Sequence, residues 1–157
     1  ELLSHPVKEL VANTSKILGK YPNTYTFTKA LCERIMQKRR GDLPMCIVRP
    51  AIINTSYQEP FPGWLDSIAA AAAMFLFVGL GIIKEVKGNV NSIGDMIPVD
   101  VVVANIIIAT AFNLKKNGMP IYHVGSSDRN PITWGRARDV VVEFWNSNPS
   151  INRVGKS

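Results

Sequence analysis

The chain has 157 residues, of which 46% are hydrophobic, and this suffices for one globular domain with a core or for part of one. Its 18 Lys and Arg residues against 12 Asp and Glu give a formal net charge of +6, which suits phosphate-bearing ligands or acidic membrane surfaces. A nucleic-acid role is disfavoured, because the densest basic cluster, residues 38–40, precedes Gly41, where cations and a glycine commonly end a helix.

The two cysteines, Cys32 and Cys46, lack metal-ligand spacing and form no disulfide framework, so we expect buried free thiols and no metal. The chain begins at Glu1 without a methionine or a signal-peptide pattern, which suggests a piece of a longer, non-secreted protein.

Two helices are predicted at the start of the chain. Apolar residues at helical spacing indicate one helix over residues 7–18, which stops at Gly19. Pro22-Asn23-Thr24 offers the start of a second helix over residues 24–40, with Leu31 and Ile35 on its buried stripe.

The second helix carries a phenol and an ammonium four residues apart. Tyr25 and Lys29 would share one helix face. An ammonium beside a phenol favours the phenolate form, so Tyr25 is a plausible proton donor. The alternative is a minor surface pair without a catalytic role.

A buried strand and a long loop are predicted next. Residues 45–48 are an unbroken apolar run, typical of a strand in a parallel sheet with both faces covered, and it should end at Arg49-Pro50. Residues 51–64 read as an irregular connection, the place where open α/β sheets bind ligands. Phe61 and Trp64 could line a pocket there or anchor a rigid turn.

Residues 68–83 raise the question of a membrane. They form 16 residues without a charge, whereas a span needs about 20, and they include five consecutive alanines. We therefore expect a buried or interfacial helix.

The rest of the chain alternates between short strands and helices. We predict an extended segment over residues 96–99, a helix over 101–112 capped by Asp100, a strand over 120–124, and a helix over 134–145 capped by Thr133. This alternation predicts an α/β domain with a parallel sheet.

The order of these motifs resembles an extended short-chain dehydrogenase/reductase, and within that group the alcohol-forming fatty acyl-CoA reductases, which carry the male-sterility-like NAD(P)-binding domain. The resemblance covers most of residues 21–134. The stretches that carry it are Pro22-Asn23-Thr24-Tyr25-Thr26-Phe27-Thr28-Lys29-Ala30-Leu31, Ile47-Val48-Arg49-Pro50-Ala51-Ile52, Glu59-Pro60-Phe61-Pro62-Gly63-Trp64, Ile97-Pro98-Val99-Asp100-Val101-Val102 and Asn130-Pro131-Ile132-Thr133-Trp134.

The resemblance implies the C-terminal half of a Rossmann-type doubly wound parallel sheet over residues 1–147, with residues 148–157 starting a linker. It also implies reduction of a long-chain acyl-CoA by NADPH to an aldehyde and then to an alcohol, with release of CoA. On the family pattern Tyr25 donates the proton, and Lys29 holds the nicotinamide ribose and makes Tyr25 easier to deprotonate. Pro50, Ile52 and Ile53 would line the nicotinamide, and Phe61 and Trp64 the acyl chain.

Arg49 could pair with a phosphate or make a structural ion pair. The family's glycine-rich turn, which holds a pyrophosphate at a helix N-terminus, does not occur in these residues, and we expect it upstream of Glu1. Peripheral contact with peroxisomal or endoplasmic reticulum membranes is a further implication. The alternatives are another extended short-chain reductase or thioester reductase, and a non-catalytic membrane-associated remnant.

Overall fold

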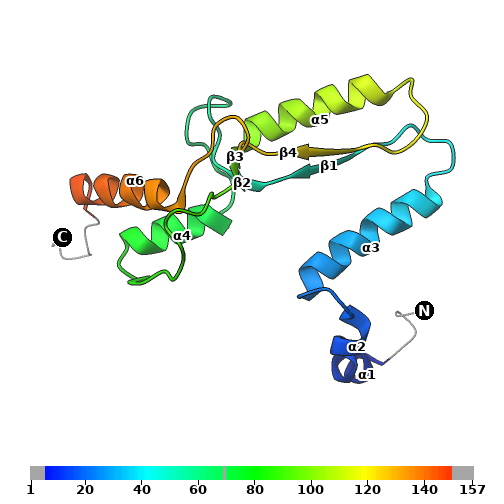
Figure 1. Cartoon of the computed structure of the whole chain (residues 1–157), viewed down its shortest axis with the longest axis horizontal. Helices are drawn as coiled ribbons and strands as arrows, with labels where there is room; N and C mark the ends of the chain where they lie inside the picture. Colours follow the sequence, from blue (N-terminus) through cyan, green and yellow to red (C-terminus); the bar gives the residue numbers. More distant parts are fainter. Residues whose placement is uncertain (1–5, 69, 150–157) are drawn as a thin grey trace.

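A computed structural model describes residues 6–68 and 70–149 as six helices and four strands (Figure 1). The helices are α1 (Val7–Ala12), α2 (Thr14–Leu18), α3 (Thr24–Arg39), α4 (Ala70–Gly79), α5 (Val99–Asn113) and α6 (Trp134–Ser147), and the strands are β1 (Ile47–Pro50), β2 (Ile52–Asn54), β3 (Met96–Pro98) and β4 (Ile121–Val124).

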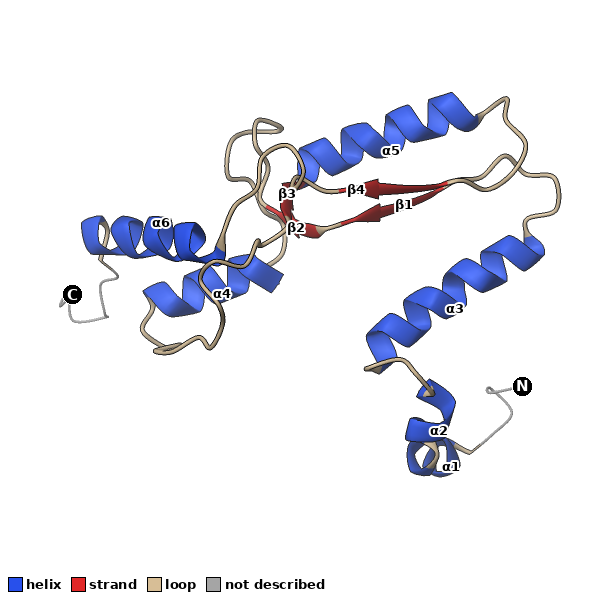
Figure 2. Cartoon of the chain, viewed as in Figure 1, coloured by secondary structure: helices blue, strands red, loops and turns tan. Residues whose placement is uncertain are grey.

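The four strands pair in parallel in two short ladders (Figure 2). β1 pairs with β4, and β2 pairs with β3. The chain changes partner at Ala51, whose N–H donates to the Val124 carbonyl at 2.9 Å, while the next N–H, of Ile52, donates to the Asp95 carbonyl at 2.9 Å. Parallel strands joined through helices confirm the predicted Rossmann-type α/β class.

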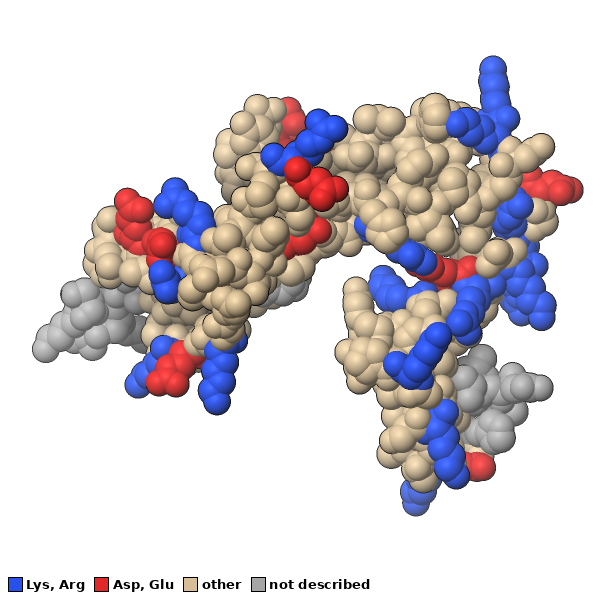
Figure 3. Space-filling model, in the orientation of Figure 1, with Lys and Arg blue, Asp and Glu red and all other residues tan. Residues whose placement is uncertain are grey.

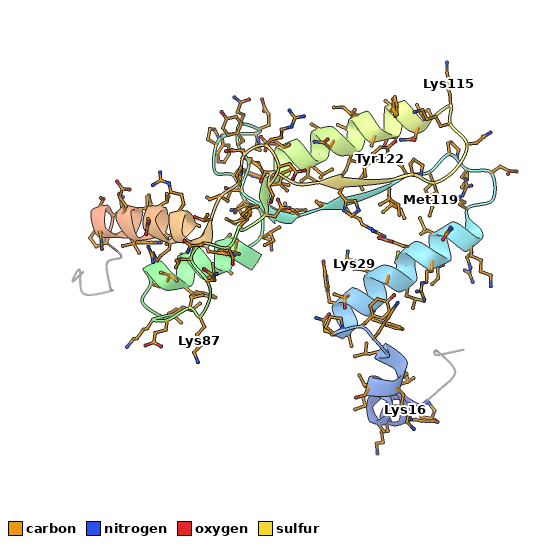
Figure 4. The ribbon with its side chains drawn as sticks, in the orientation of Figure 1. Lys16, Lys29, Lys87, Lys115, Met119 and Tyr122 are labelled. Atoms are coloured by element: carbon orange, nitrogen blue, oxygen red, sulfur yellow. The ribbon has the colours of Figure 1, made fainter. Side chains whose placement is uncertain are left out.

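The core lies between the strands and α5. Ile97, Val102 and Val124 are buried together, with Val48 and Ala51 packed against them. At the far end of α5 the buried Asn113 shares hydrogen bonds with the hydroxyl of Tyr122, which lies between β4 and α5 (Figure 4). These contacts fix α5 on one side of the strands and leave the carboxyl ends of β1 and β2 accessible.

The predicted helix over residues 7–18 is interrupted. It divides into α1 and α2 at Asn13, whose φ of −101° and ψ of 11° leave the helical region. The Asn13 side chain donates to the Glu9 carbonyl at 3.0 Å, a local bond that competes with helix continuation.

The predicted buried stripe on α3 was wrong, because α3 has no buried residue and Ile35 is 43% exposed. In Figure 1 α3 stands apart from both ladders, so its apolar face has no strand against it among the described residues. Cys32, on the same helix, is exposed and not buried, whereas Cys46 is half-buried.

The predicted end of the first strand at Arg49-Pro50 was confirmed. β1 runs through both residues, and Pro50 pairs with Val124. Pro50 is tolerated because no described strand pairs with the other edge of β1, where its N–H would have been needed. The residues after it, predicted to be irregular, form β2.

The four later elements were predicted correctly. The structure has β3 and β4 where extended segments were expected, and α5 over the β-branched run that follows Pro98. Thr133 caps α6, since its hydroxyl accepts from the Arg136 N–H at 3.2 Å. The expected linker at 148–157 falls mostly on residues 150–157, which lie outside the described residues.

The apolar run at 68–83 becomes the ten-residue helix α4. Across residues 6–68 and 70–149, none of the helices has the length and apolar character needed to cross a bilayer.

Candidate active site

The helix that carries Tyr25 begins with a side-chain cap. Asn23 has extended backbone (φ −161°, ψ 171°), and its Oδ1 accepts from the Thr26 N–H at 2.9 Å. This cap starts α3 at Thr24, so Tyr25 lies in the first turn and Lys29 one turn further. Lys29 Nζ lies 5.7 Å from the centre of the Tyr25 ring, and Lys29 projects from the side of α3 that faces the strands (Figure 4).

Tyr25 and Lys29 open into a cavity of about 960 Å³. Its other walls are the junction of β1 and β2, the segment before α4, and residues at the start of β3 and α5. The structure therefore brings six of the seven predicted site residues to one cavity: Tyr25, Lys29, Pro50, Ile52, Ile53 and Trp64.

Phe61 is the exception, because it is 58% exposed and is not among the residues that line this cavity. A turn separates it from Trp64. The Trp64 N–H donates to the Phe61 carbonyl at 3.1 Å, and Gly63 has a φ of 81°, as the third residue of a type II turn requires. Ser56, which is buried, donates its hydroxyl to the Phe61 carbonyl at 2.6 Å and accepts from the Trp64 N–H at 3.1 Å.

The loop that carries this turn is tied to α5 by Asp100. The Asp100 carboxylate accepts from the backbone N–H groups of Tyr57 (3.0 Å), Gln58 (2.8 Å) and Glu59 (3.1 Å). These bonds hold the pKa of Asp100 well below its usual range. The prediction that Asp100 is the N-cap of this helix was wrong, because α5 begins at Val99 with Pro98 as its N-cap and Asp100 lies in the first turn.

Glu33 belongs to the cavity and was missed by the sequence reasoning. Its carboxylate accepts from Arg49 Nε at 2.9 Å and from Nη2, in a two-bond ion pair that joins α3 to β1. The hydrogen bond from Arg49 lowers the pKa of Glu33. Of the two roles considered for Arg49, the structure shows the ion pair. Tyr25, Lys29 and Glu33 follow one another at intervals of four residues, and this spacing could have indicated that Glu33 lies on the same helix face as the other two.

Asp95 forms a second polar contact at the edge of the cavity. Its carboxylate accepts from the Ser126 N–H at 3.0 Å, which lowers its pKa, and Ser126 Oγ donates to the Met96 carbonyl at 2.8 Å. A Cβ at Gly125 would come within 2.7 Å of Asp95 Oδ2, so only glycine fits there without moving the carboxylate. This contact fixes the loop between β4 and α6.

The cavity combines the phenol of Tyr25, the ammonium of Lys29 and an apolar surface. Tyr25 is 68% exposed, so its hydroxyl is available to a ligand in the cavity. Lys29 offers three N–H donors of the kind that bind ribose hydroxyls, and Pro50, Ile52 and Ile53 present apolar surface beside them. These residues fit the nicotinamide half of a dinucleotide, and the phenol can protonate an oxygen bound next to it.

Basic side chains are concentrated on the same part of the molecule. Figure 3 shows Lys and Arg along the limb formed by α1, α2 and α3. The predicted preference for anionic, phosphate-bearing ligands is consistent with this distribution.

Comparison with known proteins gives consistent matches. Residues 4–106 match a family model of an NAD-binding domain described as "Male sterility protein". The chain is 39% identical over 150 residues to "Probable fatty acyl-CoA reductase 5" of Arabidopsis thaliana, covering 95% of this chain and 30% of that protein. "Fatty acyl-CoA reductase 1" of Arabidopsis thaliana is 38% identical over 156 residues (99% and 32%), and the Homo sapiens protein of that name is 38% identical over 140 residues (87% and 27%). The chain thus spans about a third of the length of these relatives.

Proposed function

Because this chain belongs to the male sterility, or fatty acyl-CoA reductase, family of NAD-binding domains, we propose that the protein containing it reduces fatty acyl-CoA. The observation that carries the proposal is the cavity that joins Tyr25 and Lys29 to the ends of β1 and β2. A match that covers 95% of the chain supports it.

Tyr25 is proposed as the proton donor. When bound, the nicotinamide supplies a hydride to the carbonyl carbon. Tyr25 donates its hydroxyl proton to the carbonyl oxygen as negative charge develops there, which lowers the barrier most in a site that excludes water. Lys29, one turn away, stabilises the resulting phenolate and binds the ribose hydroxyls.

The walls of the cavity suit the two ligands. Pro50, Ile52 and Ile53 are proposed to contact the nicotinamide, since they form the apolar wall of the cavity beside Lys29. Trp64 is proposed to contact the first part of the acyl chain. Phe61 is proposed to contribute only at the outer edge, because its side chain lies outside the lining of the cavity.

The finer features of the reaction are part of the same proposal. NADPH is the reductant, an aldehyde forms as CoA leaves, and a second reduction gives a long-chain alcohol. A substrate of this kind partitions into bilayers, so we propose peripheral contact with an intracellular membrane of the peroxisome or endoplasmic reticulum.

The test is a Tyr25→Phe variant of the complete protein encoded by the reading frame that contains this chain. NADPH consumption with palmitoyl-CoA should fall by about 10²-fold or more, the usual contribution of a general acid, while NADPH still binds. Tyr21→Phe is the matched control, because Tyr21 stacks edge-on against Phe27, is not among the cavity's lining residues, and should keep its rate. A Tyr25→Phe protein with an undiminished rate would falsify the assignment.

A further inference from the structure

A second, smaller cavity lies between α4 and α6, outside the candidate active site. Its volume is about 340 Å³, within the range of small-molecule sites. α4 contributes Met74, Phe75 and Val78, α6 contributes Ala137 and Val141, and residues 86–90 close one side. Figures 1 and 2 show α4 and α6 side by side at the end of the molecule opposite α3, and the two helices are in contact.

The cavity is held by specific contacts at both ends. A Cβ on Gly79 would lie 1.8 Å from Trp145 Cε2, so α6 can approach α4 this closely only because Gly79 has no side chain. Trp145 Nε1 donates to the Phe75 carbonyl at 3.2 Å. At the other end the Gly135 N–H donates to the Val90 carbonyl at 2.8 Å. The space is therefore part of the packing of two helices and one extended segment.

The lining is almost wholly apolar. The polar exceptions, Lys87, Asn89 and Arg138, come from the closing segment and the surface of α6. Arg138 directs its guanidinium to the Asp139 carboxylate, with Nε at 2.9 Å and Nη2 at 2.6 Å, so its hydrocarbon stem is the part left for the cavity. A hydrated polar ligand would lose hydrogen bonds in this space, whereas an alkyl chain would lose none.

α4 connects this cavity to the candidate active site. Trp64 to Ser67, directly before α4, line the cavity of Tyr25 and Lys29, and α4 itself contacts β2. Met74 lies in the second turn of α4, which begins three residues after Ser67. An acyl chain with its carbonyl at Tyr25 and its length along α4 would enter the space beside Met74.

We propose that the cavity between α4 and α6 binds the distal part of the substrate's alkyl chain and so sets the preference for chain length. The inference rests on the proposed reductase function. It assigns α4 and α6 a role in selecting substrates, while the chemistry stays at the carboxyl ends of the strands.

The test compares palmitoyl-CoA with octanoyl-CoA, whose chain is half as long, in the complete protein. Val141→Phe places a ring inside the cavity, and kcat/KM for palmitoyl-CoA should fall about tenfold or more, as expected when a hydrophobic pocket can no longer hold several methylenes. The rate with octanoyl-CoA should stay within about twofold. Val140→Phe is the matched control, because Val140 precedes Val141 on α6, is 44% exposed, and does not line the cavity.

Each other outcome has a definite meaning. Equal losses for both substrates, or an unchanged preference, overturn the inference. If Val141→Phe does not fold, the smaller change Ala137→Val serves the same comparison, since Ala137 lines the cavity and is 5% exposed. A wild-type protein that reduces neither substrate would instead overturn the proposed function.

Discussion

At the scale of single residues, the ion pair between Glu33 and Arg49 determines where Tyr25 and Lys29 lie. α3 has no buried side chain, so apolar packing alone does not fix it against the strands. The two bonds from Arg49 to Glu33 join α3 to β1 one turn beyond Lys29. Glu33 is thus a positioning residue, because it acts through the helix and not on a ligand.

Replacing this carboxylate should slow the reaction without preventing folding. We expect Glu33→Gln in the complete protein to lower kcat about tenfold, because small displacements of catalytic groups are costly. Arg49→Gln should add little further loss in the double variant, as expected for coupled partners. Glu143→Gln, an exposed glutamate on α6, is the control. Fully additive losses in a steady-state assay would contradict a shared role.

The same pair gives a pH dependence with a definite sign. The pKa of Glu33 is lowered in the folded protein, so the pair contributes its full stability above the ordinary glutamate pKa of about 4.3. That contribution is lost as the pH falls through the lowered value. Thermal unfolding of the wild type from pH 7 to pH 3 should therefore show a loss of stability in acid that is smaller in Glu33→Gln.

At the scale of elements, the contact of α4 with α6 depends on a glycine. Adding a methyl group at Gly79 forces Trp145 to move, and overpacking of this kind costs about 1–3 kcal/mol. We expect Gly79→Ala to lower the unfolding free energy of the complete protein by that amount in a denaturant titration. Gly88→Ala is the control, because a Cβ there meets nothing within 4 Å. Equal effects of the two changes would show that the crossing tolerates a side chain.

Local signals in the sequence predicted the helix starts and most of the strands. Pro22-Asn23-Thr24 indicated a helix start, Thr133 was predicted as a cap, and the apolar run before Arg49 indicated β1. β2 was missed because three residues after a proline carry no pattern of their own, and they become a strand only by pairing with β3. The role of Asp100 was missed for the same reason, since its partners lie 41 to 43 residues earlier in the chain.

The residues of the candidate site were predictable where a motif carried them. Tyr25, Lys29, Pro50, Ile52, Ile53 and Trp64 lie around one cavity, as the resemblance implied, while their roles stay a prediction. Spacing alone could not show that Glu33 binds Arg49, because that bond depends on how α3 lies against β1. The type II turn at Pro62-Gly63 leaves Phe61 exposed while Trp64 lines the cavity, and the sequence composition does not reveal this difference.

At the scale of the whole molecule, the described residues leave much apolar surface exposed. On α5 alone, Ile107 (63%), Ile108 (64%) and Phe112 (60%) are exposed, whereas the buried core is small. An exposed apolar surface of this kind normally contacts another protein segment. The chain also spans only about a third of the relatives it matches.

We therefore expect the 157-residue chain, expressed alone, neither to bind NADPH tightly nor to reduce palmitoyl-CoA. The physical reason is that these residues contain no glycine-rich turn to hold the pyrophosphate. Isothermal titration with NADPH tests this directly, and the complete protein is the control. Micromolar binding by the isolated chain would contradict the prediction.

The positions of the three tryptophans give the protein built-in optical reporters. Trp64 lines the cavity of Tyr25 and Lys29, Trp134 lines the cavity between α4 and α6, and Trp145 packs on Gly79 where these helices meet. The fluorescence of an indole changes in wavelength and in intensity when its surroundings change. Variants of the complete protein that keep only Trp64 or only Trp134 would therefore report separately on the part of the alkyl chain near Tyr25 and on its distal part, and their time courses would reveal whether the two cavities fill together.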